Sequence, residues 1–205
     1  MRKHERARQI IIYALYITSV CCLQVTFSHV FRLFGRTCDL MLVFVVLAGY
    51  LFGTKDGVVV GGIVGMFRDY FSGPVITGLD QKPVAVLGIG LLVFIYVGLL
   101  SSVLFRKRFR RKLSLGLLQV AIVTLFYCVL GHIVSWLYLS MSGNSVSYHS
   151  LNYIAFRSVL PQILVNLLAA VPILFLLRFL GPYKKGTRSG SSETYVMEEQ
   201  SWQSV

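Results

Sequence analysis

The sequence predicts an all-α polytopic membrane protein with about six transmembrane helices, of which the second and third are short. Composition is the first observation behind this fold class: 56% of the 205 residues are hydrophobic and only 14% are charged, against about 25% charged residues in soluble domains. The second is that the apolar residues form uncharged stretches close to the roughly 20 residues that a helix needs to cross a bilayer. Composition therefore disfavours both a soluble enzyme and a disordered protein.

The first three helices are expected in the N-terminal third of the chain. Residues 9–28 form the first, because no Lys, Arg, Asp or Glu occurs between Arg8 and Arg32. Residues 40–54 and 57–71 form the second and third, which are short and joined by a tight turn at Lys55 and Asp56. Five spans plus a re-entrant hairpin is the alternative for this pair.

The last three helices are expected at 83–105, 113–139 and 158–180. The uncharged stretch 113–156 is longer than one span, and the polar run at 140–150 divides it into a helix and a loop. Residues 1–181 are therefore expected to form one transmembrane domain. Residues 182–205 are polar and contain Gly and Ser, which is typical of a disordered tail, here on the cytoplasmic side.

The distribution of positive charge predicts the orientation. With the N-terminus in the cytoplasm, fifteen of the twenty Lys and Arg residues lie on the cytoplasmic side, four lie outside, and Arg68 lies within a helix. This asymmetry predicts that both termini are cytoplasmic. Because topology explains most of the net charge of +12, no nucleic-acid partner is expected.

The loop after the fourth helix contains six basic residues in seven positions. They are expected to contact anionic membrane lipids, at about 1 kcal/mol for each basic residue near such a surface, or alternatively an acidic cytoplasmic partner. The residues concerned are Arg106, Lys107, Arg108, Arg110, Arg111 and Lys112.

The third helix carries small residues at a spacing of four: Gly57, Gly61 and Gly65, then Asp69 and Gly73. Small residues at this spacing let another helix approach closely in a membrane. Asp69 is then expected to project into a packing groove. Two roles are open for its carboxylate: a structural acceptor that caps the third helix by hydrogen-bonding the turn that follows it, or a ligand, ion or proton site.

Other polar and small residues of the spans are expected at helix contacts. Ala14 and Thr18, followed by Cys22, form a weaker small-residue face on the first helix. Gln162 and Asn166 in the last helix are one turn apart and are expected to form hydrogen bonds across the bundle. The same interhelical role is expected for the polar residues of the fifth helix, namely Gln119, Thr124, His132 and Ser135.

The sequence contains no set of residues typical of an enzyme. The four cysteines show no C-x-x-C spacing, the four histidines are scattered, and Asp69 is the one acidic residue expected at membrane depth. A metal or redox site would need clustered ligands, and an intramembrane hydrolase would need facing ionisable groups. We therefore expect no catalytic activity, metal or cofactor.

Two regions of the sequence follow a recognisable pattern. In residues 24–53 an aspartate, Asp39, opens the second helix after a short external loop. In residues 57–80 a glycine-rich helix is followed by Asp69 and by the spaced glycines Gly73 and Gly78. Both regions resemble the MreD family of bacterial rod shape-determining membrane proteins, although Cys38 replaces the proline usual in the family before the aspartate. The resemblance covers roughly residues 9–180.

The resemblance implies a multi-pass protein of the bacterial cytoplasmic membrane that acts as a non-enzymatic scaffold of the cell-elongation machinery, the elongasome, which builds side-wall peptidoglycan. It implies binding to an MreC-like protein and, through it, to a class B penicillin-binding protein, RodA and MreB. The family is similar in fold to the substrate-binding subunits of energy-coupling-factor vitamin transporters, and such a subunit is the alternative function. The expected partner or helix-packing residues are Ala14, Thr18, Asp39, Gly57, Gly61, Gly65, Asp69, Gly73 and Gly78.

Overall fold

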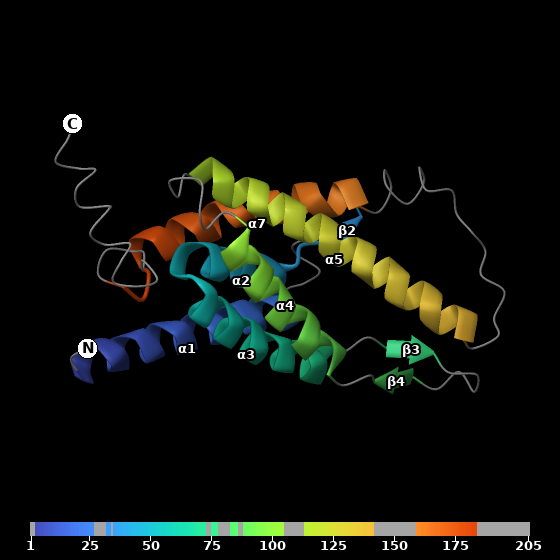
Figure 1. Cartoon of the computed structure of the whole chain (residues 1–205), viewed down its shortest axis with the longest axis horizontal. Coiled ribbons are helices and arrows are strands. Elements are labelled where there is room, and N and C mark those ends of the chain that lie inside the picture. The colour runs from blue at the N-terminus through green and yellow to red at the C-terminus, as the bar shows by residue number, and fades with distance from the viewer. Residues whose placement is uncertain are drawn as a thin grey trace.

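Six helices dominate the described part of a computed structural model of the chain (Figure 1). The structure describes residues 3–26, 32–33, 35–72, 75–77, 83–85, 88–104, 113–141 and 159–183. The helices are α1 (Lys3–Thr26), α2 (Leu40–Phe52), α3 (Thr54–Ser72), α4 (Ile89–Val103), α5 (Leu113–Met141) and α7 (Leu160–Phe179). The all-α fold class is therefore confirmed.

Two small antiparallel hairpins were not expected from the sequence. One pairs β1 (Arg32–Leu33) with β2 (Arg36–Thr37), and the other pairs β3 (Val75–Thr77) with β4 (Pro83–Ala85). Because residues 83–85 lie in the second hairpin, the prediction that the fourth helix begins at residue 83 is wrong. Gly88, with a φ of +101°, lies between this hairpin and α4 in a conformation that favours glycine.

The turn between α2 and α3 also differs from the prediction. Lys55 and Asp56 were expected to form it, but both lie in the first turn of α3. The single residue between the helices is Gly53, whose φ of +95° lies in the left-handed region. This conformation suits a residue without a side chain, so α3 begins at Thr54, three residues earlier than expected.

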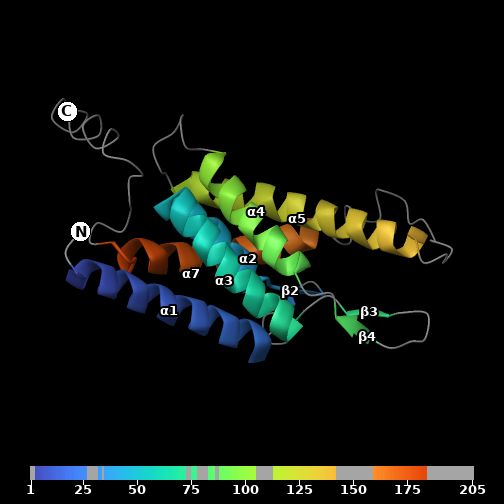
Figure 2. The same cartoon turned by 60° about the horizontal axis from the view of Figure 1, so that its bottom comes forward.

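The short helix α2 is the centre of the bundle (Figure 2). All thirteen of its residues are buried, and it contacts each of the other five described helices. A helix that is apolar on every side is stable only when it is surrounded. At about 1.5 Å per residue α2 is roughly 20 Å long, and its neighbours shield it from lipid.

The protein is a membrane protein. By length and composition, the segments Ala7–Thr26, Leu113–Gly131 and Leu160–Phe179 can each cross a bilayer, whereas Leu40–Phe52 and Gly90–Val103 are apolar but shorter. Large apolar side chains on the outer surface, among them Leu15, Phe126 and Phe175, are exposed. An apolar surface of this extent requires lipid rather than water around it.

Several predictions fall outside the described residues. These concern Gly73, Gly78, the six basic residues within 106–112, the side chains of His132 and Ser135, and the tail from residue 184. At the end of the described chain, Pro182 is buried and the ring of Tyr183 lies 5.6 Å from that of Phe52. The packed part of the chain therefore extends two residues beyond residue 181.

Candidate functional site

The glycines of α3 face the antiparallel helix α4. A Cβ atom added to Gly57 would lie 2.7 Å from the carbonyl oxygen of Gly98, and one added to Gly61 would collide with the carbonyl oxygen of Phe94. The obstacles are backbone atoms, which cannot rotate away as a side chain can. These two positions of α3 therefore require glycine.

Gly65 continues this interface by one turn. Its added Cβ would lie 2.7 Å from the Cα of Leu91, whereas a Cβ on the neighbouring Gly62 would meet only the side chain of Ile95 at 3.7 Å. The glycines spaced four residues apart are therefore required by the close contact with α4, whereas Gly62, which lies outside this spacing, is not. Gly57, Gly61 and Gly65 are covered by a helix of the same chain, so they present no free surface for a partner.

Asp69 caps the N-terminus of α4. Its Oδ2 accepts hydrogen bonds from the backbone N–H groups of Gly88 and Leu91, and its Oδ1 accepts one from Gly90, each at 2.9 Å. The first N–H groups of a helix have no partner within the helix, and a negative charge beside them is stabilising. The carboxylate is therefore a structural acceptor that caps α4. The turn that directly follows α3 lies partly outside the described residues.

Asp39 and Arg68 form an ion pair near the same end of the bundle. Asp39 is the N-cap of α2: its Oδ1 accepts a hydrogen bond of 3.0 Å from the N–H of Leu42. Its Oδ2 accepts a bond of 2.5 Å from Nη1 of Arg68. The Arg68 guanidinium carbon also lies 5.1 Å from the ring centroid of Phe94 and 5.4 Å from that of Tyr127, within the range of cation–π attraction.

The Asp39–Arg68 pair was missed from the sequence, although a signal for it existed. Asp39 lies fourteen residues before Gly53 and Arg68 lies fifteen residues after it. In an antiparallel helical hairpin, residues equally distant from the turn are neighbours. Placing the turn at Gly53 and counting outward would have brought the two opposite charges together.

Asn166 of α7 joins this pair to α5. Its Oδ1 accepts hydrogen bonds from the N–H of Asp39 at 3.0 Å and from Nε2 of Gln162 at 3.3 Å. Its Nδ2 donates to Oγ1 of Thr124 at 3.2 Å. The thiol of Cys38, whose pKa is raised by burial and by the neighbouring carboxylate, donates to the same Oδ1 at 3.8 Å. Nε2 of Gln162 also donates to the backbone carbonyl oxygen of Thr37 at 3.0 Å. The expected hydrogen bonds across the bundle are thus present for Gln162, Asn166 and Thr124.

A second polar contact joins α5 to α4. Gln119 is fully buried, and its Nε2 donates to the carbonyl oxygen of Ser101. Its Oε1 is buried without a hydrogen-bond partner among the described atoms. The expected interhelical role of Gln119 is present, with half of the amide satisfied.

The opposite end of the bundle is held by a carboxylate with two tyrosines. Asp56, in the first turn of α3, accepts a hydrogen bond of 3.0 Å from the hydroxyl of Tyr13 and another from the hydroxyl of Tyr183. Tyr13 belongs to α1, and Tyr183 follows α7. Asp56 therefore ties three segments together that are far apart in the sequence.

The small residues of α1 lie on its outer side. Ala14 and Thr18 are exposed, whereas Ile17, Val20 and Cys21 on the other face are buried against the bundle. The structure thus separates the two small-residue faces that were expected to pack helices. The face on α3 is covered by α4, and the face on α1 is open.

Three carboxylates of the described bundle make contacts between segments of the chain. Asp39 accepts hydrogen bonds from α2 and α3, Asp69 from the start of α4, and Asp56 from α1 and from the residue Tyr183 after α7. The described residues contain no group of three or more His, Cys, Asp or Glu that could hold a metal ion. Known protein families, curated proteins and solved structures contain no match to this chain.

Proposed function

We propose that this protein is a non-enzymatic, multi-pass scaffold of the bacterial cytoplasmic membrane. Its role is in the cell-elongation machinery that maintains rod shape and builds side-wall peptidoglycan. In this role it binds the transmembrane helix of an MreC-like partner, and through that partner it associates with a class B penicillin-binding protein, RodA and MreB. The proposal rests on the resemblance of residues 24–53 and 57–80 to the MreD family, together with the exposed face of α1.

The open small-residue face of α1 is the observation that carries the proposal. Helices associate in lipid chiefly through close packing, which small residues permit. Ala14 and Thr18 are one turn apart and exposed, while the equivalent glycines of α3 are occupied by α4. We therefore assign the partner contact to α1 and an internal packing role to Gly57, Gly61 and Gly65.

The ordered interior of the bundle supports a scaffold rather than a moving carrier. Asp39 caps α2 and pairs with Arg68. Asn166 of α7 is hydrogen-bonded both to Asp39 and to Thr124 of α5. Breaking such contacts one at a time is costly, since each leaves a polar group unsatisfied in an apolar interior. A rigid platform that positions a single-span partner fits this arrangement.

Co-purification with an MreC-like chain tests the proposal. Replacing Thr18 with Leu places a bulky side chain on the open face of α1, and we expect it to abolish recovery of the partner. Ser19→Leu is the matched control, because Ser19 is also exposed but is turned by about 100° around the helix. Equal recovery of the partner with both variants would contradict the assignment of this face.

A second test addresses the cellular role. Deletion of the gene should give rounded cells with reduced incorporation of side-wall peptidoglycan, and the Thr18→Leu variant should fail to restore rod shape while Ser19→Leu restores it. Normal shape and wall elongation after deletion would count against the scaffold. Specific binding of a vitamin by the isolated protein would instead favour the alternative, a substrate-binding subunit of an energy-coupling-factor transporter.

A further inference from the structure

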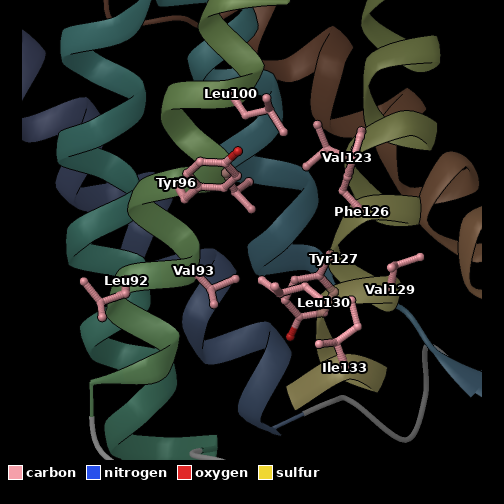
Figure 3. Close-up of a pocket in the computed structure, with 11 residues that line it drawn as sticks. Leu92, Val93, Tyr96, Leu100, Val123, Phe126, Tyr127, Val129, Leu130 and Ile133 are labelled. Atoms are coloured by element: carbon pink, nitrogen blue, oxygen red, sulfur yellow. The ribbon is translucent and has the colours of Figure 1, made fainter. Parts of the chain in front are cut away.

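An apolar groove of about 670 Å³ runs between α4 and α5 (Figure 3). One wall is formed by Leu92, Tyr96 and other residues of α4, and the facing wall by Phe126, Leu130 and other residues of α5. The two helices contact each other much less than each contacts the helices on its other side. The volume lies within the roughly 300–1,000 Å³ typical of ligand sites.

The side chains of the groove do not suit a second transmembrane helix. All eleven lining residues are Leu, Val, Ile, Phe or Tyr, and no Gly, Ala, Ser or Thr is among them. Closely packed helices in membranes use small residues at their contacts, and α3 and α4 of this chain follow that rule. A flexible hydrocarbon chain needs no close backbone approach and can fill an irregular apolar groove.

The length and depth of the groove match one leaflet of a bilayer. From Leu92 to Leu100 the groove follows α4 over eight residues, which is about 12 Å at 1.5 Å per residue. Half of the hydrocarbon core measures about 15 Å. Leu100 lies one helical turn before Leu104, the C-cap of α4, so the groove begins about 6 Å from this C-cap.

In the sequence, positive charge follows directly after this end of α4. The sequence that joins Leu104 to the start of α5 at Leu113 contains six Lys or Arg residues in the eight intervening positions. Their charges are tethered by a short stretch of chain to the ends of both helices that form the groove. This charge complements the phosphate of a lipid whose acyl chain enters the groove from that side.

We propose that the groove between α4 and α5 binds one acyl chain of an anionic phospholipid from the leaflet that faces the basic α4–α5 connection. The apolar lining, the absence of small residues and the length of one leaflet favour an acyl chain, and the positive charge that follows α4 in the sequence favours an anionic headgroup. The proposal does not depend on the partner or the cellular role proposed above.

Native mass spectrometry of the full-length, delipidated protein in detergent tests this site, with phosphatidylglycerol as the added lipid. Leu130→Trp fills the groove from α5, and we expect it to weaken phosphatidylglycerol binding about tenfold, or about 1.4 kcal/mol. Leu125→Trp is the matched control, because Leu125 is similarly exposed on α5 but does not line the groove. It should leave binding unchanged.

A second pair of variants tests the other wall and guards against misfolding of the first. Leu92→Trp lies in the groove and Leu99→Trp lies outside it, and both residues are exposed on α4. Weaker binding with Leu92→Trp alone would support the site. Phosphatidylcholine with identical chains should bind more weakly to the unaltered protein, because it lacks net charge.

Three results would overturn the proposal. The first is an equal effect of the groove and control variants in both pairs. The second is equal affinity for phosphatidylglycerol and phosphatidylcholine, which would leave only ordinary contact with bulk lipid. The third is loss of a single-span protein partner with Leu130→Trp while lipid binding stays unchanged, which would make the groove a helix-binding surface.

Discussion

The two faces of α4 are packed in opposite ways. Toward α3 the helices approach until a Cβ on Gly57 or Gly65 would collide with backbone, whereas toward α5 the large side chains of Tyr96 and Leu130 flank an open groove. In lipid no hydrophobic force draws helices together, because the tails are as apolar as the side chains. Close contact therefore depends on small residues, and large ones leave space that lipid can fill.

Arg68 links these two faces. It belongs to α3, but its guanidinium lies over Phe94 of α4 and over Tyr127 of α5, and it pairs with Asp39 at the start of α2. One side chain thus contacts residues of three other segments. The two cation–π contacts of Arg68 provide part of the attachment between α4 and α5 that small residues do not provide.

Replacing Arg68 with Leu should give the largest loss of stability. Asp39 would remain mostly buried without its partner, and breaking a buried pair from one side costs about 3–5 kcal/mol. Unfolding in mixed detergent with SDS, followed by circular dichroism, measures the loss. The double variant Asp39→Asn with Arg68→Leu removes both charges and should recover part of it. No recovery would show that the pair is not the source of the loss.

A smaller change in stability, of opposite sign at two neighbouring glycines, is expected when each is replaced by alanine. Gly61→Ala should destabilise the protein by about 1–3 kcal/mol, because its Cβ collides with the Phe94 carbonyl. Gly62→Ala has an ordinary contact and should instead stabilise α3 by up to about 1 kcal/mol. The same unfolding assay applies. The same sign of effect for both variants would contradict the interface on α3.

Asp69→Asn should destabilise the protein by about 1–2 kcal/mol, because the amide replaces one of two acceptor oxygens and removes the charge at the helix N-terminus. Hydrogen exchange should report the change first at the amides of Gly88, Gly90 and Leu91, which donate to this carboxylate. Unchanged exchange at these amides would argue against the cap.

The smallest effect is expected in the groove. Leu130 is 38% exposed, so Leu130→Ala should cost less than about 1 kcal/mol, well below the 2–5 kcal/mol of a buried Leu→Ala change. Its stability in the SDS assay should stay close to that of the unaltered protein. A loss as large as that of Gly61→Ala would mean that α4 and α5 depend on their contact as strongly as α3 and α4 do.

Much of the helical organisation was predictable, because it depends on local composition. The expected α5 began at Leu113, as observed, and α2 began at Leu40, where an uncharged apolar run follows Asp39. Errors arose where backbone pairing or a turn decided the boundary. The hairpin of β3 and β4 displaced the start of α4, and Gly53 displaced the turn before α3.

The candidate site was predictable residue by residue, but its pairings were not. A structural acceptor was one of two roles predicted for Asp69, because a carboxylate near a helix end in an apolar sequence needs donors. Its donors, however, lie 19 to 22 residues away at the start of α4. Gln162 and Asn166 were expected to bond across the bundle, and Asn166 does so with Asp39. Which donor meets which acceptor depends on helix register, and no local pattern encodes that register.

The sequence by itself determined that this chain is a helical membrane protein, because apolar content and the spacing of charges act along the chain. It also marked Ala14, Thr18 and the glycines of α3 as surfaces for close packing. Only the tertiary structure decided that α4 covers the glycines, that α1 leaves its small residues open, and that Arg68 pairs with Asp39. The reason is physical: small residues permit close contact with any helix, and the arrangement of the whole bundle determines which helix packs against them.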